Sequence, residues 1–278
     1  MAKTAWGPGG SGTMANPMSM RLPRRVEYAR DLLAVLVLKE LRVRYKRTVL
    51  GYAWSLLQPL AFAVVYYLVF KRFIKIETPG VNYTLFLVCG LFAWQWFSNG
   101  VVSSTMALVS NGPLITKVSF PRIYAVFSGF MNDLVHFLLA TPVILGFLLA
   151  FGYRPHLSWL WLLPTLLLVQ GVLVLGLSLL FATLNLFMRD LERLVTIGML
   201  MLFHLTPVVY PETLIPKQFQ WIVIVNPMGS LSINWRDALL NGHADPAMLG
   251  VSAAVAAVSL ALGVTVFFKL QARFAEVV

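Results

Sequence analysis

The stretch LTPVVYPETLIPKQFQWIVIVNPMGSLSINWRDALLN, residues 205–241, decides how the chain is folded. Prolines divide it into pieces that a continuous membrane helix does not tolerate without compensation; they are Pro207, Pro211, Pro216 and Pro227. Two short amphipathic runs lie between or after the prolines, around residues 219–225 and 230–240. Irregular backbone at membrane depth is tolerated where it packs in protein or lines a water-filled path. We therefore expect a short re-entrant or surface segment at the mouth of such a path.

The composition of the whole chain indicates an all-α integral membrane protein. Of its 278 residues, 59% are hydrophobic and 12% are charged, and the mean hydropathy is +0.77. Soluble domains carry about 45–50% apolar and about 25% charged residues. A net charge of +11 would suggest a nucleic-acid partner in a soluble domain, but here we expect none. The single cysteine, Cys89, excludes a disulfide within the chain.

The N-terminal 47 residues differ in character from the rest. Residues 1–23 are polar and glycine-rich and lack the apolar core of a secretory signal, so we expect a disordered leader. Residues 24–47 have an apolar centre of only seven residues, 32–38, whereas a membrane crossing needs about 20. Charges crowd both ends of this centre. We expect a cytoplasmic amphipathic interface helix with its basic face toward anionic headgroups or a partner; a solvated helix start is the alternative.

Six apolar segments follow and make residues 48–278 the expected transmembrane domain. They cover residues 49–70, 83–108, 123–151, 157–188, 194–210 and 247–268. Six spans put both termini on one side, and cytoplasmic loops carry an excess of lysine and arginine. With both termini cytoplasmic, that side holds sixteen of the 22 basic residues. The sequence therefore predicts cytoplasmic termini and an external segment of short helices at about residues 211–241.

The last apolar segment carries small residues on one helical face. Ala253, Ala257 and Ala261 follow one another at intervals of four. Small residues at this spacing let helices approach closely in a membrane. Six spans also offer few helices to surround a wide path, so we expect a homodimer.

Asp133 and His136 are the ionisable residues within the predicted spans that invite a chemical role. They stand one helical turn apart in the third span. Intramembrane ionisable groups suggest a proton relay or a catalytic pair, and a buried polar contact or a position near the membrane edge is the alternative. The chain has no HExxH, GxSxG or cysteine–histidine cluster, so we expect no metal site and no serine hydrolase. It also has no Walker A loop, and ATP would have to be bound by another polypeptide.

Aromatic residues are dense near the start of the first two spans. Tyr52, Phe62, Tyr66 and Phe70 share approximately one helical face, and Trp54 lies nearby in sequence. Interfacial belts account for many membrane aromatics. Aromatic faces also stack on sugar rings, so a glycan path is the second interpretation.

The loop NGPLITKVSFPR, residues 111–122, is short, basic and flanked by Pro113 and Pro121. Its composition suits a small helix lying across the membrane surface. It equally suits an ordinary connector, and composition alone does not decide between the two.

Four motifs, in order along the chain, resemble the signatures of polysaccharide-export permeases of the ABC type-2 superfamily. RYKRTVLGYAWSLLQPL at 44–60 is similar to the basic-aromatic, Leu-Gly, Trp, Pro signature that opens their first span. LITKVSFPR at 114–122 and RDLERL at 189–194 resemble their loops before the third and fifth spans. TPVVYPETLIP followed by NPMGSLSINWRDALL resembles the signature before their last span. The family exports O-antigen, capsule and teichoic acid.

This resemblance implies a homodimer in the bacterial inner membrane that binds two copies of a nucleotide-binding ATPase subunit. That partner would bind ATP and Mg, with no cofactor in this chain. The cargo would be a polyprenyl-pyrophosphate-linked polysaccharide, with O-antigen as the leading candidate, moving between the protomers amid membrane lipid.

The resemblance also suggests roles for individual residues. The cytoplasmic coupling helix that contacts the ATPase would include Leu114, Ile115, Lys117, Phe120, Pro121 and Arg122. Sugar platforms would be Tyr52, Trp54, Phe62 and Tyr66. The external gate would include Tyr210, Pro211, Pro216, Asn226, Pro227 and Arg236. Candidates to meet the pyrophosphate are Arg42, Arg44 and Arg47, because guanidinium groups bind phosphate well; simple positive-inside anchoring is their alternative role.

Two other function classes remain open from the sequence. One is an exporter of the same superfamily that carries a drug or another small hydrophobic molecule. A membrane-embedded transferase would use Asp133 and His136 as its reactive pair. A secondary transporter has little support, because the chain shows no inverted repeat.

Overall fold

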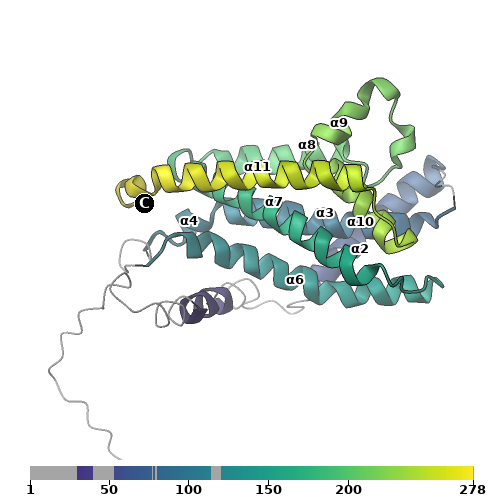
Figure 1. The fold of residues 1–278 in the computed structure, drawn as a ribbon, viewed down its shortest axis with the longest axis horizontal. Coiled ribbons are helices and arrows are strands. Elements are labelled where there is room, and N and C mark those ends of the chain that lie inside the picture. Colours follow the sequence, from purple (N-terminus) through teal and green to yellow (C-terminus); the bar gives the residue numbers. More distant parts are fainter. Residues whose placement is uncertain (1–29, 40–52, 77, 79, 114–119, 278) are drawn as a thin grey trace, which may run out of the picture.

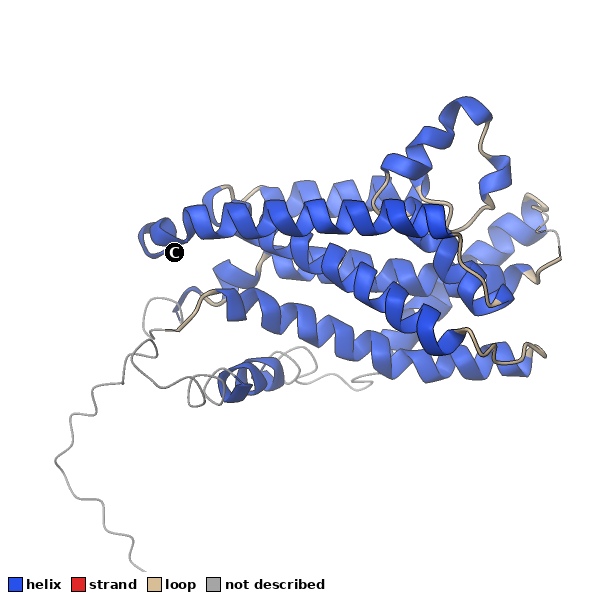
Figure 2. Cartoon of the chain, in the orientation of Figure 1, coloured by secondary structure: helices blue, strands red, loops and turns tan. Residues whose placement is uncertain are grey.

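The computed structural model describes residues 30–39, 53–76, 78, 80–113 and 120–277. Every regular element in these parts is a helix, and strands are absent from them (Figures 1 and 2). Four of the described helices are long and apolar enough to cross a membrane. They are α3 (Tyr83–Thr105), α6 (Ile123–Ala150), α7 (Trp159–Phe187) and α11 (Pro246–Leu270). The predicted all-α character is confirmed for the described chain.

Two further helices correspond to the first and fifth predicted segments. Helix α2 (Trp54–Tyr66) continues directly into a π-helical stretch, η3 (Tyr67–Phe73). Helix α8 (Leu191–Leu205) is 15 residues long and ends five residues before the predicted boundary. It ends there because Thr206 precedes Pro207 and adopts an extended conformation, which is the conformation that a following proline favours.

Helix α3 lies at the centre of the bundle. Of the residues in its most apolar stretch, 78% are buried, whereas the corresponding share in α11 is 22%. Helix α3 contacts α2, α6, α7 and α8 and the short α10 (Gly229–Asn241). It ends at Thr105, and a separate turn, α4 (Ala107–Ser110), follows. The groups that matter for function therefore surround α3.

Helix α11 packs along α7 through small residues. A Cβ atom placed on Gly263 would lie 2.2 Å from the carbonyl oxygen of Gly176, so the two backbones nearly touch. Ser252 and Ala256 are also buried, whereas the alanines of the predicted contact face are exposed: Ala253, Ala257 and Ala261. The contact within one chain thus uses a neighbouring set of small residues, and the predicted set faces outward.

The proline-rich segment folds into short helices at the end of the bundle opposite the C-terminus (Figure 1). It comprises η4 (Glu212–Leu214), η5 (Lys217–Phe219), α9 (Gln220–Val225) and α10. Helix α9 and its neighbours form a lobe that projects away from the bundle, whereas α10 returns to pack on α3 and α7. Helices α9 and α10 form at the positions of the two short runs noted in this segment, but α10 is buried on nearly all sides and is not amphipathic in its surroundings.

Gly229 permits the sharp return from α9 to α10, and its replacement by alanine is expected to destabilise the protein. An added Cβ would lie 2.0 Å from the carbonyl oxygen of Val223, so backbone would have to move. Such overpacking costs about 1–3 kcal/mol. Thermal unfolding of the purified protein should show a lower Tm for Gly229→Ala. The matched control is Gly250→Ala, whose added Cβ meets nothing within 4 Å; equal Tm values for the two variants would contradict the expectation.

Candidate functional site: a polar groove and an arginine-anchored segment

A groove of about 410 Å³ lies between α2, α3 and α8. Aromatic rings form part of its lining: Phe62, Tyr66, Trp94 and Phe203. Polar side chains form another part: Gln58, Gln95, Ser98, Asn99 and Thr196. None of the described lining residues carries a formal charge. Aliphatic side chains complete the lining: Leu91, Val102, Ile197, Met199 and Leu200. The described part of the groove is therefore neutral and mainly apolar, with a minority of hydrogen-bonding groups.

The aromatic side of the groove follows from the spacing of residues on α2. Phe62 and Tyr66 are four residues apart, so their side chains lie on the same face. Their ring centroids are 6.2 Å apart with an interplanar angle of 27°. The Tyr66 ring centroid lies 5.5 Å from that of Phe203 on α8, and the Trp94 ring centroid on α3 lies 5.4 Å from that of Phe203. Three helices thereby contribute to one aromatic cluster, in which Trp94 and Phe203 are buried and Tyr66 is half-buried.

Of the other two predicted sugar platforms, the structure describes only Trp54, which lies outside the groove. Trp54 is 50% exposed near the start of α2 and is not among the residues that line the groove. Tyr52 is outside the described residues. Phe70 extends the aromatic row beyond Tyr66, with ring centroids 6.0 Å apart.

The polar side of the groove centres on two amides of α3. Gln95 and Asn99 are one turn apart, and Asn99 Nδ2 donates a hydrogen bond to Gln95 Oε1 at 3.4 Å. Both are half-buried in an otherwise apolar helix. Each amide has more donor and acceptor sites than this one bond uses. The sequence analysis missed these residues, although two amides one turn apart within a predicted span were a usable signal.

Rings and amides together suit a ligand that has both hydroxyl groups and flat apolar faces. Amides donate hydrogen bonds to hydroxyl groups and accept hydrogen bonds from them. Aromatic faces stack on successive units of a polymer with little dependence on which unit is stacked. The absence of charge in the described lining means that no single contact holds a ligand tightly. This arrangement fits a chain that slides through a succession of weak contacts.

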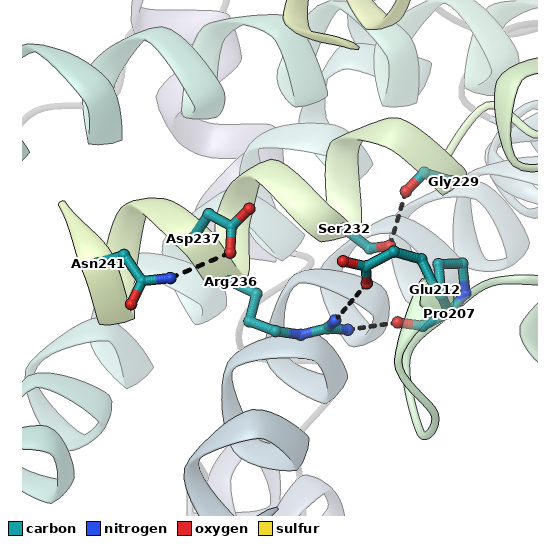
Figure 3. Close-up of polar contacts among 7 residues, drawn as sticks. All are labelled: Pro207, Glu212, Gly229, Ser232, Arg236, Asp237 and Asn241. Atoms are coloured by element: carbon teal, nitrogen blue, oxygen red, sulfur yellow. Dashed lines mark hydrogen bonds and ion pairs between the residues drawn. The ribbon is translucent and has the colours of Figure 1, made fainter. Parts of the chain in front are cut away.

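Arg236 of α10 anchors the proline-rich segment to the bundle (Figure 3). It is 4% exposed, and its Nη2 donates a hydrogen bond to the carbonyl oxygen of Pro207. Its Nη1 lies 3.5 Å from Glu212 Oε2, and its Cζ lies 3.5 Å from the ring centroid of Phe86 on α3. Burial lowers the pKa of the guanidinium from its ordinary 12.5 to about 10, and Glu212 opposes this shift. Arg236 therefore stays charged at neutral pH.

Further hydrogen bonds fix the backbone between α8 and α10. Tyr83 Oη donates to the carbonyl oxygen of Val209 at 2.7 Å. Asn226 Nδ2 donates to Thr206 Oγ1 at 2.7 Å, and its Oδ1 accepts from the Met228 amide at 3.0 Å. These contacts hold the two ends of the segment against each other and against α3.

The predicted gate residues divide into an anchored set and a projecting one. Arg236 and Asn226 are buried in the contacts just described, and Pro211 is also buried. Tyr210 is half-buried and donates to the His204 carbonyl oxygen at 2.9 Å, while Pro227 is half-buried. Pro216 is exposed on the lobe. Glu212, which pairs with Arg236, was not identified from the sequence.

Asp133 and His136 lie in the bundle between α6 and its neighbours, 4% and 8% exposed. Asp133 Oδ2 accepts a hydrogen bond of 2.5 Å from Ser103 Oγ on α3. The geometry favours the interpretation of Asp133 as a buried polar contact that joins α6 to α3.

The predicted cytoplasmic residues are only partly within the described chain. Phe120 is buried, Pro121 is exposed, and Arg122 Nη1 donates to the carbonyl oxygen of Gln271. The others lie outside the described residues: Leu114, Ile115, Lys117, Arg42, Arg44 and Arg47. Among described residues, no group of three or more histidine, cysteine or acidic side chains is arranged to hold a metal ion.

Comparison with known protein families identifies the family of this chain. The model of the ABC-2 type transporter family matches residues 31–232. The chain belongs to this family. The resemblance inferred from the four motifs is thereby confirmed, and the protein is a multi-pass membrane protein.

Curated relatives cover nearly the whole chain. An O-antigen export system permease protein, RfbA of Klebsiella pneumoniae, is 41% identical over 94% of this chain and 100% of its own. The RfbA permease of Myxococcus xanthus is 33% identical over 92% of this chain and 99% of its own. The polysialic acid transport protein KpsM of Escherichia coli is 23% identical over 75% of this chain and 81% of its own.

Proposed function

We propose that this chain is the permease subunit of an ATP-driven exporter that carries a lipid-linked polysaccharide, of the O-antigen class, out of the cytoplasm. The neutral groove between α2, α3 and α8 carries the proposal, because rings and amides suit a sugar polymer. The similarity to O-antigen export permeases over nearly the full length supports it. A small apolar drug would not need the Gln95–Asn99 amide pair.

The proposed topology has six spans. Helices α2–η3 and α8 supply the first and fifth spans beside the four long helices, and both termini lie on the cytoplasmic side of a bacterial inner membrane. The proline-rich segment is then external. Two protomers form a homodimer with their grooves toward a shared path. Two copies of a separate ATPase subunit bind ATP and Mg on the cytoplasmic side.

The proposed cycle assigns one task to each region. Arg42, Arg44 and Arg47 meet the pyrophosphate of the polyprenyl carrier. The groove offers replaceable contacts along which the polymer slides. Closure of the ATPase subunits pushes the coupling segment, residues 114–122, and the anchored segment around Arg236 gives way at the external end.

Depletion of the protein in its host tests this function directly. Finished polyprenyl-linked glycan should accumulate on the cytoplasmic side of the inner membrane, and surface polysaccharide should disappear, because synthesis continues while export stops. Glycan extraction from right-side-out and inside-out vesicles gives the two amounts. Re-expression of the wild-type chain is the control. Normal surface glycan after depletion would contradict the proposal and favour a small-molecule exporter.

A further inference from the structure

A second buried cluster lies at the end of the bundle that holds the C-terminus. It is separate from the core around α3 and joins residues that are far apart in sequence. Its members include Leu36, Leu108, Phe120, Leu179, Phe267 and Phe274. These residues come from the helical stretch 30–39, from both flanks of segment 114–119, and from α7, α11 and the C-terminal tail.

Phe274 is the tail residue that enters this cluster. It opens the short helix α12 (Phe274–Val277), follows η6 (Gln271–Arg273), and is 0% exposed. Its ring meets Phe267 of α11 at 5.3 Å in an edge-on arrangement and lies 6.3 Å from Phe187 at the end of α7. The last residues of a chain are usually poorly ordered unless something ties them down. Here a fully buried ring does so.

Arg122 connects the tail to the coupling segment. Its Nη1 donates to the carbonyl oxygen of Gln271, the residue that caps the end of α11. The Gln271 carbonyl also accepts a hydrogen bond from the Phe274 amide, and a cation at the end of α11 is favoured by the helix dipole. The Arg122 guanidinium also lies 5.8 Å from the ring centroid of Phe274. The side chain thus fastens the C-terminal flank of segment 114–119 to the end of α11.

The other flank of the same segment is fastened to the helical stretch 30–39. Lys39 Nζ donates to Asn111 Oδ1 at 2.6 Å, and Asn111 Nδ2 donates to the carbonyl oxygen of Ala107 at 2.9 Å. Leu36, from the same stretch, is 3% exposed in the cluster. The described flanks of the segment are therefore both held: Asn111 by Lys39 from the stretch before the first span, and Arg122 by Gln271 after the last.

From this arrangement we infer that the C-terminal tail, residues 271–277, braces the coupling segment. The inference rests on the proposed function, in which an ATPase subunit pushes that segment. If Arg122 were not attached to the end of α11, a push from the ATPase would move only the coupling segment. Because it is attached, the push also displaces α11. Helix α7 then moves with α11, because their backbones nearly touch at Gly176 and Gly263. Phe274 acts here through Arg122 and Phe120, as a positioning residue.

The test compares export with ATP hydrolysis in the full permease–ATPase complex. Phe274→Ala removes the ring and should lower polysaccharide exported per ATP hydrolysed by about fivefold or more, the size of a typical coupling effect. ATP hydrolysis per assembled complex should stay within about twofold of wild type. Phe274→Leu keeps much of the apolar volume and should restore most of the ratio. The matched control is Phe268→Ala, on the last turn of α11 and 54% exposed, which should leave the ratio unchanged.

The outcomes separate this inference from the proposed function. Wild-type complex that exports no polysaccharide contradicts the proposed function, whatever the variants do. Wild-type export with an unchanged ratio in Phe274→Ala overturns the brace alone. A parallel fall of complex amount, ATP hydrolysis and export, with the ratio preserved, also overturns it, because Phe274 would then serve only assembly.

Discussion

Ser98→Trp is expected to stop polysaccharide export while the complex assembles and hydrolyses ATP. Ser98 is half-buried in the lining of the groove, beside the Gln95–Asn99 pair and facing α2 and α8. An indole at this position fills a large part of the 410 Å³ between the three helices. A polymer in the groove then meets a steric block that weak, replaceable contacts do not overcome. Surface polysaccharide should fall by at least about tenfold, which corresponds to roughly 1.4 kcal/mol in the effective barrier.

Two control variants isolate the block from general damage. Val258→Trp adds the same side chain on α11 at a position that is 59% exposed, and it should export normally. Ser98→Ala removes one hydroxyl and should also export nearly normally, because a sliding polymer needs no single hydrogen bond. Cells are scored for surface polysaccharide and for the amount of permease in the membrane. Wild-type export by a well-assembled Ser98→Trp protein would show that the polymer does not pass along this groove.

Local sequence patterns predicted those parts of the fold that depend on neighbours in sequence. The two short runs became α9 and α10 because each pattern is complete within one short stretch. The shared face of Phe62 and Tyr66 followed from four-residue spacing on one helix. The end of α8 was misplaced because apolar composition continues through residues 205–210, while Pro207 forces Thr206 out of the helical conformation.

Those local patterns did not predict contacts between helices. Trp94, Gln95 and Phe203 face the same groove only because α3 lies between α2 and α8. Likewise, Arg122 and Gln271 are 149 residues apart, and neither motif nor spacing links them. The stripe of Ala253, Ala257 and Ala261 is the opposite case, in which a pattern was present but its residues make no buried contact within the chain. Its pattern marked a helix rich in small residues, but the buried small residues of α11 are Ser252, Ala256 and Gly263, and Gly263 makes the close backbone contact with α7.

Arg236→Met is expected to loosen the proline-rich segment and to lower the thermal stability of the protein. The substitution removes the hydrogen bond to the Pro207 carbonyl, the ion pair with Glu212 and the contact with the Phe86 ring. A hydrogen bond from a charged group contributes about 1.5–3 kcal/mol, and a desolvated cation–π contact about 2 kcal/mol. These terms overlap because one guanidinium makes all three contacts, so we expect a net loss of roughly 2–4 kcal/mol.

Arginine is required at position 236 by geometry as well as by charge. The guanidinium is planar, so one face lies over Phe86 while its edge reaches Pro207 and Glu212. A lysine ammonium is a compact point charge that cannot do both. Arg236→Lys should therefore resemble Arg236→Met in its lower Tm. Glu212→Gln should cost only about 0–1 kcal/mol, because the Glu212 side chain is 42% exposed and water screens the pair.

The matched control is Lys217→Met, which removes a basic residue from the exposed η5 turn of the same segment. It should leave both Tm and export at the wild-type level. Arg236 joins α10, the proline-rich backbone and α3. Its loss therefore tests whether this segment is a barrier that holds the path shut or only a cover over it. If the segment is the barrier, Arg236→Met vesicles should leak a small sugar tracer without ATP, whereas Lys217→Met vesicles stay sealed. A destabilised but sealed Arg236→Met protein would place the barrier elsewhere on the path.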